Sequence, residues 1–132
     1  MRVLLVHAQT PNRDRLARLL TAAGHEVRAV SAPVGAFALC RAWAPSVALV
    51  HVECCGDLVV QVKGDPVAYG TAIVMIEGAG LDPAQALEGM RTGIADYLVE
   101  PFADGEVLTR VEAAGRTKEL QQELVADRKS VV

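Results

Sequence analysis

Four side chains capable of chemistry stand at the ends of apolar segments of strand length: His7, His51, Glu77 and Glu100. Two imidazoles and two carboxylates can form hydrogen-bonded pairs or bind a transition metal such as zinc or copper, whereas Mg²⁺ prefers hard oxygen ligands. The sequence offers no nucleophile with a general base to activate it. We therefore expect a site that binds or signals, and no enzymatic activity.

The segment expected to deliver His51 is the most buried part of the chain. Residues 45–52 (PSVALVHV) form a continuous apolar run rich in β-branched residues, which is typical of a central strand buried on both faces of a parallel sheet. In open α/β sheets the chemistry lies in a crevice beyond the carboxyl ends of the strands. His51 is predicted to point into that crevice.

Hydrophobic periodicity and turn residues predict five strands that alternate with five helices. The strands are expected over residues 2–7, 26–30, 45–52, 71–76 and 95–99. The helices are expected over residues 11–23, 34–43, 58–63, 83–92 and from 104 toward 124. Short connections with right-handed crossovers predict an α/β fold with a doubly wound, five-stranded parallel sheet in the flavodoxin-like order 2-1-3-4-5.

The spacing of apolar residues also predicts helix caps and the helix faces that pack on the sheet. Thr10 and Asp82 are expected to be the N-caps of the first and fourth helices, each followed by a proline. The second helix is expected to bury Val34, Phe37, Ala38 and Ala42. The fourth helix is expected to bury Ala84, Ala86, Leu87 and Met90.

Composition narrows the class of protein. A chain of 132 residues with 52% hydrophobic and 22% charged residues has the size and balance of one folded domain. The net charge of −3, with no basic stripe, argues against direct binding of nucleic acid. The apolar runs are too short to span a bilayer, and the N-terminus lacks the features of an export signal. Three cysteines make no disulfide framework, so we expect a cytoplasmic protein.

The C-terminal part extends beyond what the predicted sheet needs. We expect a domain over residues 1–115 and an extended helix or tail over residues 116–132. Ala113, Thr117, Leu120 and Leu124 keep the spacing of a short coiled-coil seam, although a solvated, frayed end fits the same pattern. The functional interpretation is a connector to an output domain or a partner.

The chain resembles the receiver domain of bacterial response regulators over nearly its whole length. The most specific match is the run at residues 93–102 (GIADYLVEPF), and weaker matches lie at residues 3–6 (VLLV) and 45–50 (PSVALV). The resemblance implies two-component or phosphorelay signal transduction in the cytoplasm. It also implies a carboxyl edge that holds an acidic pair for Mg²⁺, a phosphoacceptor aspartate, a Thr or Ser, and a Lys.

This sequence departs from the receiver pattern at each of those positions. The acidic pair falls on His7 and Ala8, and the phosphoacceptor aspartate falls on His51. The hydroxyl residue falls on Glu77, and the lysine falls on Glu100. Two positions that the resemblance assigns are kept: the switch aromatic Tyr97 and the proline of the turn, Pro101. The resemblance is therefore to an atypical receiver, or pseudo-receiver, for which we expect no conventional aspartyl phosphorylation and no cofactor.

Two functions remain open at this point. The first is a signalling module that works by protein–protein interaction, with an output domain, a partner or a second copy bound through the fourth helix, fifth strand and last helix. The alternative is a metal- or pH-responsive sensor that uses the pocket of His7 and His51. Its candidate metal ligands are His7, His51 and Glu77, with Glu53, Cys54 or Cys55 as further donors.

Overall fold

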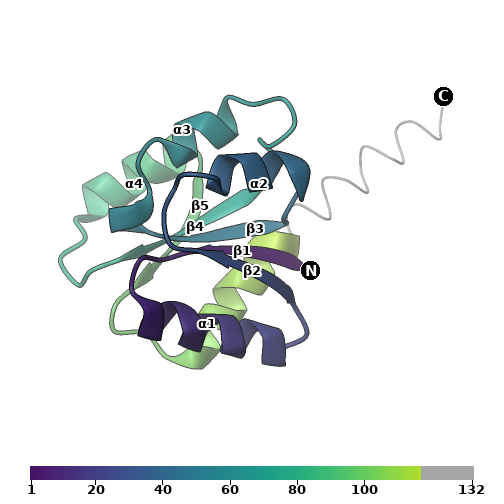
Figure 1. Cartoon of the computed structure of the whole chain (residues 1–132). Coiled ribbons are helices and arrows are strands. Elements are labelled where there is room, and N and C mark those ends of the chain that lie inside the picture. Colours follow the sequence, from purple (N-terminus) through teal and green to yellow (C-terminus); the bar gives the residue numbers. More distant parts are fainter. Residues whose placement is uncertain (117–132) are drawn as a thin grey trace, which may run out of the picture.

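The alternation of strands and helices predicted from the sequence is present in the structure, a computed structural model that describes residues 1–116 (Figure 1). The strands are β1 (Arg2–Val6), β2 (Glu26–Val30), β3 (Val47–His51), β4 (Ala72–Glu77) and β5 (Ile94–Val99). The helices are α1 (Thr10–Ala22), α2 (Ala36–Ala42), α3 (Leu58–Lys63) and α4 (Pro83–Thr92), and a C-terminal helix begins at residue 104. Most of the predicted coiled-coil seam and nearly all of the predicted tail lie outside the described residues.

The five strands are all parallel and lie in the order β2-β1-β3-β4-β5, which confirms the predicted topology. Helices α2, α3 and α4 cover one face of the sheet, and α1 and the C-terminal helix cover the other (Figure 1). This arrangement follows from right-handed crossovers, which place helices on both faces of a parallel sheet. It also brings the carboxyl ends of the strands to one edge.

The strands β1, β3 and β4 lie between two hydrophobic cores, one on each face of the sheet. Alternate residues of each strand point to opposite faces, so Leu4 and Val50 pack beneath α2 and α3 while Leu5 and Leu49 pack against α1 and the C-terminal helix. The four apolar residues of β3 are fully buried, which explains the continuous apolar run in the sequence. The strand that carries His51 is therefore held rigidly from both sides.

The predicted inward face of α2 is wrong except at Phe37, which packs against the core. The helix begins at Ala36 rather than at Val34, after Gly35 in a left-handed conformation with φ of 86°. Val34 is consequently 88% exposed. The buried residues are Ala36, Cys40 and Trp43, whose spacing of four and three forms an apolar stripe with a different phase.

The predicted inward face of α4 is wrong except at Ala86, whereas its cap is confirmed. The Asp82 carboxylate accepts a hydrogen bond from the Ala84 backbone N–H at 3.0 Å. No residue of α4 is fully buried, and Leu87 is 62% exposed. The helix turns Ala86, as predicted, and Gly89 toward the sheet, because the ring of Tyr97 on β5 occupies the space beneath it.

Helix α1 starts one residue earlier than predicted. Gln9 rather than Thr10 is the N-cap, and its side chain does not cap the helix. Gly24 follows this helix in a left-handed conformation, with φ of 95°. A search of residues 1–116 for a helix with the length and hydrophobicity needed to span a bilayer finds none.

Candidate functional site

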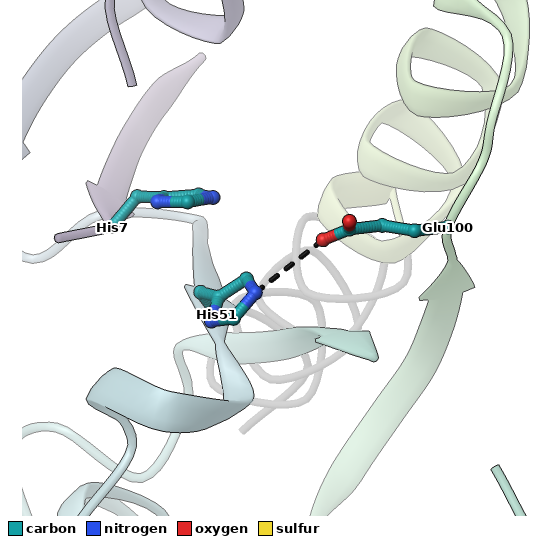
Figure 2. Close-up of side chains that lie close together, drawn as sticks. All are labelled: His7, His51 and Glu100. Carbon is teal, nitrogen blue, oxygen red and sulfur yellow. Dashed lines mark ion pairs between the residues drawn. The ribbon is translucent and has the colours of Figure 1, made fainter. Parts of the chain in front are cut away.

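The carboxyl edge of the sheet brings together side chains that are far apart in the sequence. His7 follows β1 directly, His51 ends β3, and Glu100 follows β5. Val6 pairs with Val50 in the sheet, so the residues that come next on these strands, His7 and His51, lie side by side. The expected crevice is therefore formed by these three positions (Figure 2).

His51 forms an ion pair or hydrogen bond with Glu100 across the sheet. Its Nε2 atom lies 3.3 Å from Glu100 Oε1 (Figure 2). The imidazole of His7 stands against that of His51, with ring centroids 4.5 Å apart and ring planes at 43°. The three side chains thus form one contiguous group across the ends of β1, β3 and β5, and we name this group the edge triad.

Backbone amides select the tautomer of both histidines. The Gln9 N–H donates to His7 Nδ1 at 3.2 Å, and the Glu53 N–H donates to His51 Nδ1 at 3.3 Å. An amide N–H can only donate, so each Nδ1 atom must be an unprotonated acceptor and each neutral ring carries its proton on Nε2. His51 therefore presents an N–H donor to the Glu100 carboxylate.

His7 is the most buried polar group of the site. It is 2% exposed, and burial lowers its pKa below the ordinary value, with the nearby His51 and Arg13 acting in the same direction. The carboxylates of Glu100 and Glu53 oppose that shift without overcoming it. His7 is consequently a neutral imidazole near pH 7, the form that binds metals or accepts hydrogen bonds.

The remaining predicted pocket residues are not part of the edge triad. The charge of Glu77 acts on Tyr97 and Cys55, raising the pKa of both beyond the effect of their burial. Ala8 is exposed and offers no polar side chain. The Glu100–Pro101 peptide bond, which follows the triad, is cis.

The cysteines after β3 are poor candidates for metal ligands in this structure. Burial raises the pKa of the Cys55 thiol, which disfavours the thiolate that binds metals. Cys54 is buried, and its Sγ atom lies 3.9 Å from the Ser31 carbonyl oxygen. Within residues 1–116, the residues that come close enough to share a metal ion are His7, His51 and Glu100, with one donor atom from each lying within 4.8 Å of the other two. Glu100 thus takes the place that the sequence analysis gave to Glu77.

A cavity of about 390 Å³ opens beside the edge triad. His7 and Glu100 form one of its walls, and α1 and the segment after β5 form the rest, through Asn12, Arg15, Leu16, Pro101 and Phe102. A crevice at this edge was predicted from the sequence, whereas the part of its lining that α1 contributes and the amides of Gln9 and Glu53 were not. Every non-proline residue has a backbone N–H, so no residue type signals which amide will face a side chain.

Tyr97, the predicted switch aromatic, is buried beneath α4. A Cβ atom placed on Gly89 would overlap the Tyr97 hydroxyl, so the inward position of the ring depends on a glycine at this point of the helix. Burial raises the pKa of the phenol, and the charge of Glu77 raises it further. The structure thus shows the inward orientation of this side chain.

Comparison with known proteins supports the receiver fold. No model of a protein family matches the chain. The chain is 28% identical over 125 residues to the transcriptional regulatory protein KdpE of Mycobacterium tuberculosis, an alignment that covers 94% of this chain and 55% of that protein. It spans about half the length of the curated relatives it matches.

Solved structures show the same architecture. NtrX from Brucella abortus, in complex with ADP, superposes with a TM-score of 0.86 at 27% identity, covering 97% of this chain and 29% of that one. A putative response regulator from Chloroflexus aurantiacus superposes with a TM-score of 0.78 at 25% identity, covering 87% of this chain and 97% of that one. The chain therefore has the fold of a response-regulator receiver domain, with the flavodoxin-like strand order.

Proposed function

We propose that this chain is a regulatory domain of the response-regulator type that signals through protein contacts, without aspartyl phosphorylation and without catalysing a reaction. The observation that carries the proposal is the pairing of His51 with Glu100 at the edge where the receiver resemblance expects an aspartate and a lysine. The similarity to KdpE, named as a transcriptional regulatory protein, supports a regulatory role. Cytoplasmic location is part of the proposal, and three cysteines that form no disulfide framework within residues 1–116 fit a reducing compartment.

The loss of phosphoryl chemistry follows from the groups present. Phosphoryl transfer to a carboxylate needs a divalent cation held by hard oxygen ligands and a nucleophile in line with the phosphorus. His7 and Ala8 supply no carboxylate after β1, and His51 supplies no acyl-phosphate acceptor. The carboxylate of Glu100 would repel a phosphoryl group that a lysine would hold.

The test is to incubate the chain with Mg²⁺ and a small phosphodonor, then measure its intact mass and map any acid-labile label. We expect the mass to stay unchanged. A matched variant restores the residues of the receiver pattern: His7→Asp, Ala8→Asp, His51→Asp, Glu77→Thr and Glu100→Lys. We expect that variant to take up a phosphoryl group on position 51, whereas a labelled aspartate in the unaltered chain contradicts the proposal.

The interaction surface proposed for signalling comprises α4, β5 and the C-terminal helix. Apolar side chains are exposed on it, chiefly Leu87 and Met90 on α4 and Val99 at the end of β5. Asp96 on β5 is joined to Arg110 of the C-terminal helix by contacts of 2.9 and 3.0 Å, which holds these two elements together. Exposed apolar side chains beside charged ones are typical of a surface that binds another protein, and we propose a second copy of this chain as the occupant.

A further inference from the structure

We propose that His7, His51 and Glu100 bind one divalent transition-metal ion of the zinc class. This site would cross-link the ends of β1, β3 and β5. The proposal does not depend on the absence of phosphorylation, because metal binding and phosphoryl transfer are measured separately.

The donor set favours zinc over magnesium. Two imidazoles and one carboxylate are a ligand combination that proteins use for Zn²⁺, which accepts nitrogen and oxygen donors together. Mg²⁺ requires nearly octahedral oxygen coordination, and the triad offers one carboxylate.

The spacing of the donor atoms is close to that of a tetrahedral site. Metal–ligand bonds of about 2.0–2.1 Å at tetrahedral angles place neighbouring ligand atoms about 3.3 Å apart. His51 Nε2 and Glu100 Oε1 already lie 3.3 Å apart. One donor atom from each of the three side chains lies within 4.8 Å of the other two, so an inward movement of the His7 ring on the order of 2 Å completes the set.

Metal binding requires a change of tautomer in both rings. When Nε2 coordinates the metal, its proton moves to Nδ1, and no proton is released from a neutral ring. The contacts of Nδ1 with the amides of Gln9 and Glu53 are then lost. These contacts are 3.2 and 3.3 Å long, which marks them as weak hydrogen bonds, and two coordination bonds replace them.

The fourth coordination position faces space rather than protein. His7 and Glu100 both line the cavity of about 390 Å³, which is large enough to admit water. A site with three protein ligands and one open position is the usual form of an accessible zinc site. The ion can therefore reach the triad from solvent without unfolding of the domain.

Titration of chelator-treated full-length chain with Zn²⁺, in competition with a chromophoric chelator, tests the proposal. We expect one ion per chain, no competition from Mg²⁺, and visible absorption bands of tetrahedral Co²⁺ when cobalt replaces zinc. A stoichiometry near zero overturns the proposal.

Matched variants assign the site. Glu100→Gln removes a ligand from a half-exposed side chain, so the fold is expected to survive, and zinc affinity should fall at least about 100-fold. Glu77→Gln alters the glutamate at the end of the neighbouring strand and should leave affinity unchanged.

His51→Asn should abolish binding, whereas His25→Asn, at the amino edge beside Met1 and Glu112, should not. The proposal is overturned if the two glutamate variants lower zinc affinity equally, or if the two histidine variants do. Unfolding curves of each variant verify the fold.

Discussion

At the scale of residues, the carboxyl edge of this sheet keeps a polar pair but exchanges the sign of its members. The receiver resemblance expects a carboxylate on the third strand and an ammonium after the fifth. Here His51 donates from Nε2 and Glu100 accepts, at a separation of 3.3 Å. The same two strand ends are thus joined by an imidazole and a carboxylate, and we propose that this pair does not support aspartyl phosphorylation.

The first prediction concerns this pair. Glu100 is nearly half exposed, so the contact is worth little, and Glu100→Gln should change the free energy of unfolding by less than about 1 kcal/mol. The glutamine oxygen can still accept from His51. Glu100→Lys places a donor against a donor and should destabilise the chain by up to about 1 kcal/mol. Urea unfolding of both variants measures the difference.

A double-mutant cycle supplies the control for that prediction. Adding His51→Asp to Glu100→Lys restores opposite charges, so the two changes together should cost less than the sum of each alone. Strictly additive costs would contradict the pairing of His51 with Glu100.

At the scale of elements, the sheet was predictable from the sequence, whereas the buried faces of its helices were not. The apolar runs of β1, β3 and β4 are buried on both faces, so a correct strand assignment identifies these three as the central strands of the sheet. Helices α2 and α4 are short and rich in small residues, so their sequences allow more than one apolar stripe. Contacts with the sheet select the stripe that is buried, and those contacts are not visible in the helix sequence.

The functional site was likewise predictable only in part. Parallel strands bring their carboxyl ends together, so the convergence of His7, His51 and Glu100 was expected from their positions. The choice of Glu77 as the carboxylate of a metal site was wrong, because the carboxylate that reaches both histidines depends on the direction in which the chain leaves β4 and β5. The tautomers of the two histidines depend on backbone amides and were likewise beyond prediction.

The packing of α4 on β5 leads to a second prediction. Gly89→Ala places a Cβ atom against the Tyr97 hydroxyl and the Ile94 side chain, and overpacking of this kind costs about 1–3 kcal/mol. Gly105→Ala in the C-terminal helix meets no neighbour and should stabilise by up to about 1 kcal/mol, because alanine favours helix. Urea unfolding of the two variants should give opposite signs. Equal stabilisation by both would show that Tyr97 does not lie beneath Gly89.

A third prediction concerns the loop between α3 and β4. Asp65 accepts hydrogen bonds from the Val67 and Ala68 backbone amides and pairs with Arg41 of α2 at 3.1 Å. The amides lower the pKa of the carboxyl first, and Arg41 lowers it further. Because the pKa is lower in the folded state, Asp65 stabilises the fold above its unfolded pKa of about 3.8, and that contribution disappears as pH falls through the folded pKa.

The variant Asp65→Asn tests this linkage. It should be less stable than the unaltered chain in urea at pH 7, and the difference should shrink when both are unfolded at a pH below the folded pKa. A difference that is independent of pH would mean that Asp65 contributes through packing alone.

At the scale of the whole molecule, exposed apolar side chains lie both inside and outside the proposed interaction surface. Leu87 is 62% exposed on α4, within the proposed interaction surface, and Val60 is 74% exposed on α3, outside it. Both stand on helices that cover the same face of the sheet (Figure 1). They differ in whether a second copy of the chain would bury them.

This contrast defines a fourth prediction. Leu87→Glu should weaken self-association at least about tenfold, since it buries a charge in the proposed interface, whereas Val60→Glu should leave it unchanged. Sedimentation equilibrium over a range of concentrations measures the association constant. A chain that stays monomeric at every concentration, or that loses association equally in both variants, contradicts the proposed dimer surface.

The central claim is that the carboxyl edge no longer accepts Mg²⁺ or a phosphoryl group. Its most direct test is to record the backbone amide resonances of residues 7, 51 and 100 while adding Mg²⁺ together with beryllofluoride, a mimic of the phosphoryl group. We predict that these resonances stay in place at millimolar concentrations of both. Saturable shifts of the amides at all of these strand ends would contradict the account.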